Sequence, residues 1–169
     1  MIRKVGSDDF ATILQVINVA AKAYRGVIPE DRWKDPYMSA EELRGELAAG
    51  VQFYGWWEGD SLLGVMGIQS VQDTTLIRHS YVLPCHQRRG IGGRLLKHLL
   101  GLVTTPHVLV GTWDDASWAI RFYTQHGFTI VSRKETDRLL RKYWRIPERQ
   151  IATSVVLQRT RPDLPAPDG

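Results

Sequence analysis

The sequence contains only one cysteine, Cys85, among its 169 residues. A single thiol cannot form an internal disulfide, which excludes a disulfide-stabilised secreted scaffold and fits a reducing, cytoplasmic compartment. No apolar run approaches the roughly 18 residues that a membrane span requires. Residues 1–4 are not followed by the apolar segment of a signal peptide. We therefore expect a cytoplasmic protein that does not associate with membranes.

A strong charge imbalance is also missing. Lys and Arg number 22 against 18 Asp and Glu, which gives a net charge of +4 at pH 7. Acidic residues interrupt the basic ones, so the continuous basic surface that nucleic-acid binding requires is not predicted. The mild positive charge favours an anionic ligand such as a phosphorylated cofactor. The length, 43% hydrophobic content and absence of internal repeats predict one domain over residues 1–158 and a proline-rich tail over residues 159–169.

The most informative segment is residues 87–94, which read Gln-Arg-Arg-Gly-Ile-Gly-Gly-Arg. This segment lies between an extended run at residues 75–83 and a helical run at residues 95–100. A strand, a glycine-bearing turn and a helix in this order form an anion site, because glycine permits a tight turn and the first N–H groups of a helix have no internal partner. The pattern favours a phosphate cradle over its alternative, an arginine-rich turn on a solvated surface.

The spacing of these glycines differs from that of other phosphate-binding loops. A P-loop requires a lysine directly after its glycines, and a dinucleotide-binding fingerprint requires Gly-x-Gly-x-x-Gly after the first strand. Here the order is Gln-x-x-Gly-x-Gly, deep inside the chain. This order resembles the pyrophosphate loop of the GNAT superfamily, the acyl-CoA-dependent N-acyltransferases. Residues 82–84 look like the end of that family's fourth strand, and residues 119–128 look like its fourth helix and the turn into its sixth strand.

The order of elements agrees with this resemblance, which covers roughly residues 1–158. Apolar spacing and turn residues predict strands at residues 2–5, 51–57, 62–71, 75–83, 108–112, 128–131 and 151–157. Helices are predicted from Ser7 or Asp8 to residue 24, from an N-cap at Ser39 to residue 49, at 92–103, from Asp114 or Asp115 to 126, and from an N-cap at Ser132 to 143. The predicted fold class is α/β (α+β), a mixed, mostly antiparallel sheet of about seven strands flanked by helices.

The resemblance implies acetyl-CoA as the cofactor and assigns residues to it. The backbone of Tyr81, Val82 and Leu83 would contact the pantetheine arm and polarise the acetyl carbonyl. Ala119 is a further implied contact on the later helix, while Ala116 stands where the family often has a cofactor-binding asparagine. The residues implied at the pyrophosphate are Gln87, Arg88, Arg89, Gly90, Ile91, Gly92, Gly93 and Arg94.

Two side chains are candidates for proton transfer. Tyr123 occupies the family's position for the acid that protonates the leaving thiolate, although it also fits the inward face of its helix. His79, on the predicted strand at residues 75–83, is the candidate base, because the unperturbed pKa of histidine is near neutral. A structural histidine is the alternative there, with Asp73, Glu58 or a water chain as competing routes. Cys85 beside Pro84 is expected to take no part in the chemistry.

The acceptor amine is expected between the early helices and the segment before the last strand. Trp33 and Tyr37 would stack on a cationic amine, with acidic residues nearby in the same loop. Trp144 and Arg149 are the candidates from the later segment, and Arg149 suits an acceptor that bears a carboxylate. Each of the four also fits a role as surface cover.

Together these features predict an acetyl-CoA-dependent N-acetyltransferase that acetylates a primary amine of a small molecule by direct attack, without a metal. Two alternatives stay open. One is a protein or peptide acceptor, and the other is a non-catalytic acyl-CoA-binding domain. The predicted partners are acetyl-CoA and an amine, with no nucleic acid and no membrane, and a homodimer is compatible with this prediction.

Overall fold

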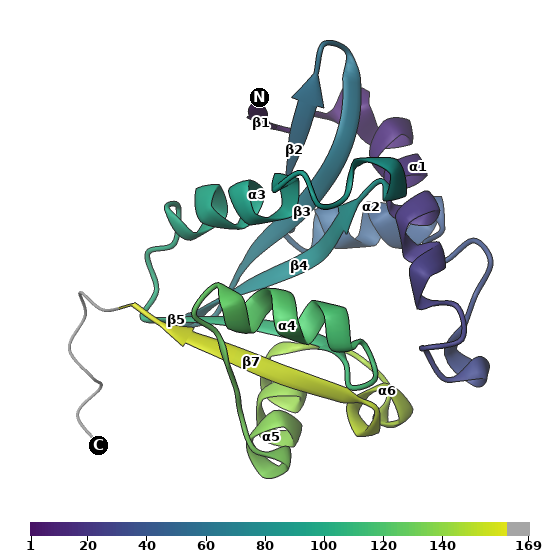
Figure 1. Cartoon of the computed structure of the whole chain (residues 1–169). Helices are drawn as coiled ribbons and strands as arrows, with labels where there is room; N and C mark the ends of the chain where they lie inside the picture. Colours follow the sequence, from purple (N-terminus) through teal and green to yellow (C-terminus); the bar gives the residue numbers. More distant parts are fainter. Residues whose placement is uncertain (162–169) are drawn as a thin grey trace. The chain divides into compact units, whose positions relative to one another are not determined.

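The structure, a computed structural model, describes residues 1–161. Residues 162–169, most of the predicted proline-rich tail, lie outside the described part of the chain. The chain forms two compact units, which can be followed by colour in Figure 1. The first comprises Met1–Gln69 and Ile77–Leu102, and the second comprises Ser70–Leu76 and the chain from Val103 onward.

The first unit is built on four neighbouring strands, and it contains the third up to Gln69 and the fourth from Ile77 onward. The strands are β1 (Ile2–Lys4), β2 (Gln52–Glu58), β3 (Ser61–Val71) and β4 (Thr74–Val82), in the order β1-β2-β3-β4. Strand β2 pairs antiparallel with both β1 and β3, with Phe53 opposite Gly67 and Gly55 opposite Val65. Short turns join β2, β3 and β4, as the alternating sequence between residues 51 and 83 predicts.

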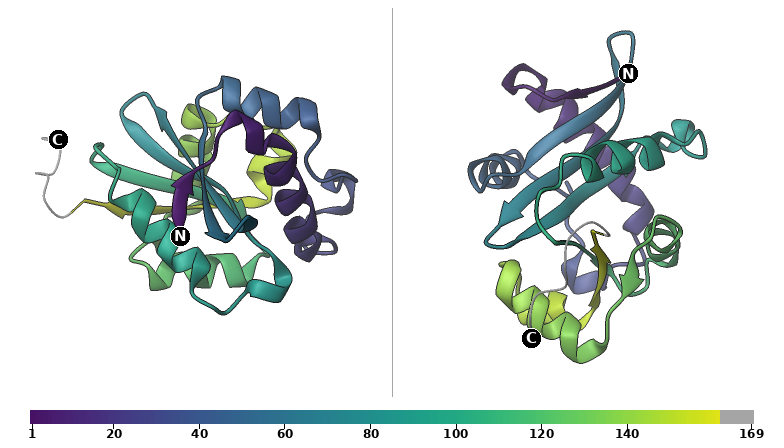
Figure 2. Two further views of the ribbon diagram at one scale, coloured as in Figure 1. Left: turned by 90° about the horizontal axis from the view of Figure 1, so that it is seen from above. Right: turned by 90° about the vertical axis from the view of Figure 1, so that its left-hand side faces the viewer.

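Helices cover both faces of these strands. Alternate residues of a strand point to opposite faces. Phe53 and Trp57 of β2 are buried in a core with α1 (Phe10–Ala20) and α2 (Ala40–Ala48). Tyr54 and Trp56 point to the other face, where Tyr54 meets His98 of α3 (Ile91–Leu100) with ring centroids 5.3 Å apart. Figures 1 and 2 show α3 on the opposite side of the strands from α1 and α2.

The second unit contains the strands β5 (His107–Trp113), β7 (Ser154–Thr160) and β6 (Thr129–Ile130), with antiparallel pairing of β5 to β7 and of β7 to β6. Helix α4 (Ser117–Gln125) lies over one face, and α5 (Arg133–Tyr143) and α6 (Glu148–Ala152) lie over the other, as Figure 1 shows. Leu109, Leu140, Ile151 and Val156 form the core between these two helices and the strands.

Several predicted elements are confirmed at the level of single contacts. The Ser39 hydroxyl accepts a hydrogen bond from the Glu42 N–H at 3.1 Å and begins α2. The Ser132 hydroxyl accepts one from the Glu135 N–H, also at 3.1 Å, and begins α5. Both helices therefore begin at the predicted N-caps, because a serine oxygen satisfies one of the free N–H groups of the first turn.

Other predictions were wrong in detail. The first predicted helix is interrupted, because 3-10 turns at Ser7–Asp9 and Ala21–Tyr24 flank α1. The helix predicted to start at Asp114 or Asp115 has Ala116 as its N-cap. The last strand starts at Ser154 rather than at residue 151, and it continues to Thr160. Ile151 is buried from the short helix α6, which the alternating apolar pattern of residues 151–157 concealed.

Residues 1–161 contain neither a membrane-spanning helix nor a metal-binding cluster. None of the helices there is long and apolar enough to cross a membrane. Over the same residues, His, Cys, Asp and Glu side chains form no group of three or more that could hold a metal ion.

Helix α2 provides a test of the packing in the first unit. Leu43 is 0% exposed and Leu47, on the same helix, is 39% exposed. We expect Leu43→Ala to lower the free energy of unfolding by about 2–5 kcal/mol, because it leaves a cavity. Leu47→Ala should change the same quantity by less than about 0.5 kcal/mol. Urea unfolding measures both, and equal losses would contradict the described orientation of α2.

Candidate active site

The loop after β4 has the backbone of an anion-binding turn. A 3-10 turn, Pro84–His86, follows the strand, and then Arg88 and Gly90 both adopt left-handed conformations, with φ of 62° and 78°. This conformation is uncommon for arginine and easy for glycine. The Arg94 N–H donates to the Gly90 carbonyl at 3.0 Å. The N–H groups before it, at Ile91–Gly93, therefore lie at the open N-terminus of α3 without an acceptor inside the helix.

The arginines of this loop have different surroundings. Arg89 forms an ion pair with Glu58 at 2.7 Å and lies 2.8 Å from the His86 Nδ1. The Arg94 guanidinium lies 5.2 Å from the centre of the Trp56 ring. Arg88 is exposed, and no ion pair of the described residues involves it. Arg88 is thus available to a ligand phosphate, and Arg89 would have to leave Glu58 to reach one.

Backbone hydrogen bonds orient the end of β4. The Leu83 N–H donates to the Leu63 carbonyl of β3 at 2.9 Å, and the Gln87 side chain donates to the Val82 carbonyl at 3.3 Å. Successive backbone groups of a strand point to opposite edges. The Val82 N–H therefore points away from β3. It is the backbone donor in the segment 81–83 that can contact a ligand.

His79 has an unusual conformation within β4. Its φ is 54°, in the left-handed region that a non-glycine residue seldom occupies, and such strain is often found at functional sites. The His79 Nε2 lies 2.7 Å from the Glu46 Oε2, and the Arg78 Nη1 lies 2.8 Å from the same oxygen. Glu46 comes from α2. The His79 side chain is 16% exposed and is stacked near Phe53.

Burial and neighbouring charges together set the protonation states of His79 and Glu46. Burial lowers the pKa of His79 below 6.5, and this effect exceeds the opposing hydrogen bond to Glu46. For Glu46, burial alone would raise the pKa, but the hydrogen bond with His79 and the charge of Arg78 bring the pKa below 4.5. A neutral imidazole donates from one nitrogen and accepts at the other. With Nε2–H directed at the Glu46 carboxylate, the Nδ1 of His79 carries the basic lone pair.

The other carboxylates that the sequence offered as bases are engaged elsewhere. Glu58 forms the ion pair with Arg89. Asp73, in the second unit, accepts a hydrogen bond from the Tyr143 hydroxyl at 2.7 Å, and this bond lowers the pKa of the Asp73 carboxyl. His79 is therefore the candidate base whose surroundings best suit that role in the first unit.

Four aromatic rings connect the acceptor loop with β4. Tyr24 and Tyr37 are stacked, with centroids 6.3 Å apart, and Trp33 lies 5.9 Å from Tyr37. Tyr81 meets both tyrosines edge-on, each at 6.3 Å. The structure therefore brings Tyr37, a predicted acceptor residue, next to Tyr81, a predicted cofactor residue, and places Trp33 beside Tyr37.

A cavity of about 410 Å³ opens beside this cluster. We call it the α1 pocket, because four of the residues that line it come from the end of the first helix and the turn that extends it. Its lining residues are Gln15, Asn18, Val19, Lys22, Arg25, Trp33, Asp35, Pro36 and Tyr37. Asn18 also holds the loop in place, since its side chain donates to the Met38 carbonyl and accepts from the Met38 N–H.

Tyr123 lies on α4 in the second unit. Its side chain is 5% exposed and meets Phe128 with ring centroids 5.6 Å apart. Ala119, one turn earlier, is buried on the same helix. The two residues share the inward face of α4, so packing in this unit holds the Tyr123 ring in one position.

Trp144 and Arg149 also lie in the second unit. The Trp144 indole packs on β5, where a Cβ atom added to Gly111 would lie 3.4 Å from it. Arg149 is exposed on α6. The two residues therefore differ in surroundings, since Trp144 is part of the unit's packing and Arg149 lies at its surface.

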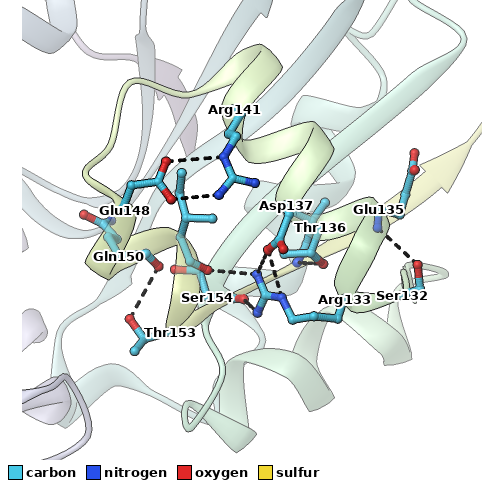
Figure 3. Close-up of polar contacts among 12 residues, drawn as sticks. Ser132, Arg133, Glu135, Thr136, Asp137, Arg141, Glu148, Gln150, Thr153 and Ser154 are labelled. Atoms are coloured by element: carbon cyan, nitrogen blue, oxygen red, sulfur yellow. Dashed lines mark hydrogen bonds and ion pairs between the residues drawn. The ribbon is translucent and has the colours of Figure 1, made fainter.

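Charged contacts fix the segment that carries Trp144 and Arg149. Arg133 donates to the Ser154 carbonyl at 2.7 Å and to the Ile151 carbonyl at 2.8 Å, and Figure 3 shows how it joins α5 to the start of β7. Arg141 of α5 forms an ion pair with Glu148 of α6 at 2.7 Å. Arg133 thus supplies a donor to a carbonyl of the last turn of α6, and the Arg141–Glu148 ion pair joins α5 to α6.

Three functional candidates escaped the sequence analysis. Glu46 meets His79 across 33 residues of chain, and no local pattern indicates that pairing. Lys22 and Arg25 line the α1 pocket. The sequence did contain a local signal that part of the pocket lining shares one helix face. The spacing i, i+3, i+4, i+7 relates Gln15, Asn18, Val19 and Lys22.

Comparison with known proteins identifies the family. The family model described as Acetyltransferase (GNAT) domain matches residues 18–141. The chain belongs to the GNAT acetyltransferase family. The peptidyl-lysine N-acetyltransferase YiaC of Escherichia coli is 26% identical over 144 residues, which are 85% of this chain and 93% of that protein. The predicted family and enzyme class are confirmed.

Solved structures confirm the predicted fold. The PaiA N-acetyltransferase of Thermoplasma acidophilum, in complex with coenzyme A, matches with a TM-score of 0.73 and 17% identity over 95% of this chain and 98% of that chain. YncA of Salmonella typhimurium, a putative acetyltransferase solved with acetyl-CoA, matches with a TM-score of 0.66 and 18% identity. The match covers 99% of this chain and 97% of that chain. The chain thus has the GNAT fold.

The lowered pKa of His79 predicts how the free energy of unfolding depends on pH. The unfolded chain binds a proton at this imidazole with a pKa near 6.5, and the folded protein binds it only at lower pH. The unfolded state therefore holds more protons in this window, and stability falls as the pH drops below about 6.5. We expect His79→Asn, which tolerates the left-handed backbone, to reduce this loss.

Urea unfolding at about pH 7.5 and about pH 5.5 measures the effect. Glu46 contributes a loss of stability of the same sign, but it falls at lower pH, because the pKa of its carboxyl lies below 4.5. His98→Asn, at an exposed position of α3, is the control. An unchanged pH dependence in His79→Asn would show that this imidazole is not buried in its neutral form.

Proposed function

We propose that this GNAT N-acetyltransferase moves the acetyl group of acetyl-CoA to the primary amine of a small molecule by direct attack. The loop after β4 is the observation that carries the proposal. Its two left-handed residues, Arg88 and Gly90, turn the chain so that free N–H groups at the start of α3 point out of the helix. The same residues have the family's order Gln-x-x-Gly-x-Gly.

The residues of this loop fit a pyrophosphate. The N–H groups of Ile91, Gly92 and Gly93 supply backbone donors, and the positive end of the α3 dipole favours an anion. Arg88 adds an unpaired positive charge. A Cβ at Gly90 would meet nothing within 4 Å, so the open side of the turn is not filled by the protein.

Acetyl-CoA, when bound, supplies the thioester whose carbonyl carbon the amine attacks. The Val82 N–H, which points away from β3, would donate to the carbonyl oxygen as negative charge develops there. His79 would accept the proton of the attacking amine at Nδ1, and Glu46 would hold the imidazole in the required tautomer. Tyr123 would donate its phenolic proton to the departing sulfur. One C–N bond would form and one C–S bond would break. The amine proton would pass to His79, and the CoA sulfur would receive a proton from Tyr123.

A protein lysine is the second candidate acceptor. The observation that favours it is the 26% identity with a peptidyl-lysine N-acetyltransferase over most of both chains. A small-molecule acceptor is supported by the α1 pocket and the aromatic rings of Trp33 and Tyr37 at its side, which suit a compact ligand. Acetylation of unstructured lysine peptides at the rate of free amines would favour the protein acceptor.

Calorimetric titration with acetyl-CoA tests the loop. We expect the wild type to bind in the micromolar range and Gly92→Trp to lose binding, because the indole covers the N–H donors of α3. Gly45→Trp in α2 is the matched control, since a Cβ there meets nothing within 4 Å. Binding that survives in Gly92→Trp would place the pyrophosphate elsewhere. A wild type that does not bind would remove the proposal.

Steady-state release of the CoA thiol tests the acid. We expect Tyr123→Phe to lower kcat about 100-fold or more while acetyl-CoA binding is unchanged, because the phenol acts only on the leaving thiolate. Tyr54→Phe, a phenol on the α3 face of β2, should keep wild-type kcat. If Tyr123→Phe also keeps the wild-type kcat, the Tyr123 side chain only contributes to the packing of α4. If the wild type binds acetyl-CoA but acetylates no amine, the chain is a non-catalytic binding domain.

A further inference from the structure

The α1 pocket has two walls of different character. One is the outward side of the first helix and the turn after it, where Gln15, Asn18 and Lys22 follow helical spacing. The other is the loop segment that carries Trp33 and Tyr37. The volume of about 410 Å³ lies within the range of small-molecule sites.

The charges of the α1 pocket are not neutralised by the protein. Lys22, Arg25 and Asp35 all line it, and none of them takes part in an ion pair among the described residues. Lys34, one residue before Asp35, differs because it forms an ion pair with Glu42 at 2.6 Å. The pocket thus carries two unpaired positive charges and one negative charge. A ligand group with a single negative charge would neutralise the net positive charge of the pocket.

The aromatic wall connects the pocket with the proposed reaction site. Tyr37 lines the pocket and also packs against Tyr81 of β4, with ring centroids 6.3 Å apart. A ligand in the pocket is therefore separated by one tyrosine ring from the strand segment proposed to hold the acetyl group. Trp33 lies beside Tyr37 and adds to the apolar wall of the pocket.

We propose that the α1 pocket binds the carboxylate of the acceptor, which Lys22 and Arg25 hold while the hydrocarbon stem lies on Trp33 and Tyr37. The acceptor class is then a primary amine with a carboxylate at its far end. This inference rests on the proposed function for the position of the amine. Arg25 can bind a carboxylate through two parallel N–H donors, and Lys22 adds a compact positive charge.

Matched ligands that differ only in the carboxylate test the proposal. We would titrate 6-aminohexanoate and hexylamine into the protein in the presence of CoA, so that binding is measured without turnover. We expect 6-aminohexanoate to bind roughly tenfold more tightly than hexylamine, as charge-assisted hydrogen bonds allow. The double variant Lys22→Gln/Arg25→Gln should bind both ligands equally. Lys34→Gln removes one positive charge of the same loop outside the pocket and should keep the wild-type preference.

Asp35→Asn separates this proposal from its opposite. If the pocket holds a carboxylate, removing the charge of Asp35 should tighten the binding of 6-aminohexanoate. If the pocket instead holds the ammonium group, Asp35→Asn should weaken the binding of hexylamine, which would overturn the proposal. Equal binding of both ligands by the wild type, no binding of either, or an unchanged preference in the double variant would overturn it as well.

The outcome does not depend on acetyl transfer. If the carboxylate preference is present and lost in the double variant, but no CoA thiol is released with 6-aminohexanoate and acetyl-CoA, the carboxylate site stands. The proposed function then fails for this class of acceptor. Lys22 and Arg25 are exposed, so the double variant should unfold at the wild-type urea concentration.

Discussion

The hydrogen bond from Leu83 to Leu63 fixes the end of β4, and the site of the first unit depends on it. It commits one edge of the strand to β3 and directs the Val82 N–H to the other edge. Only a short segment separates the end of β4 from the start of α3. The left-handed conformations of Arg88 and Gly90 allow the chain to turn from the strand into the helix within this segment. The N–H donors of the helix are exposed as a consequence of how the strand ends.

Strand β4 also carries the largely buried imidazole of His79, where an apolar side chain could fill the same space. A left-handed histidine in a strand costs free energy, and so does a buried imidazole that must stay neutral. Glu46 offsets part of this cost, because its carboxylate accepts from His79 and is itself paired with Arg78. The result is an oriented, neutral imidazole held between α2 and β4. Strain of this kind clusters at functional sites, which supports the proposed role of His79.

The donor side and the acceptor side of this protein differ in how closely the fold constrains them. The loop that suits a pyrophosphate is part of the strand-to-helix connection, so its geometry follows from the fold. The proposed acceptor side depends on the loop between α1 and α2, where Trp33, Tyr37 and unpaired charges line the α1 pocket. Loops can change without disturbing the core, and one fold can therefore serve many acceptors.

The sequence by itself determined the features that depend on neighbouring residues. The glycine and arginine loop, the N-caps at Ser39 and Ser132 and the meander of strands were all predicted, because turns, caps and periodicity are local. Helix α6 was missed, since Ile151 fits an alternating pattern as well as a helical one. Only the tertiary structure joined Glu46 to His79 and gathered Trp33 and Tyr37 with Lys22 and Arg25 around a pocket. Such pairings depend on how distant segments pack, and no local pattern carries that information.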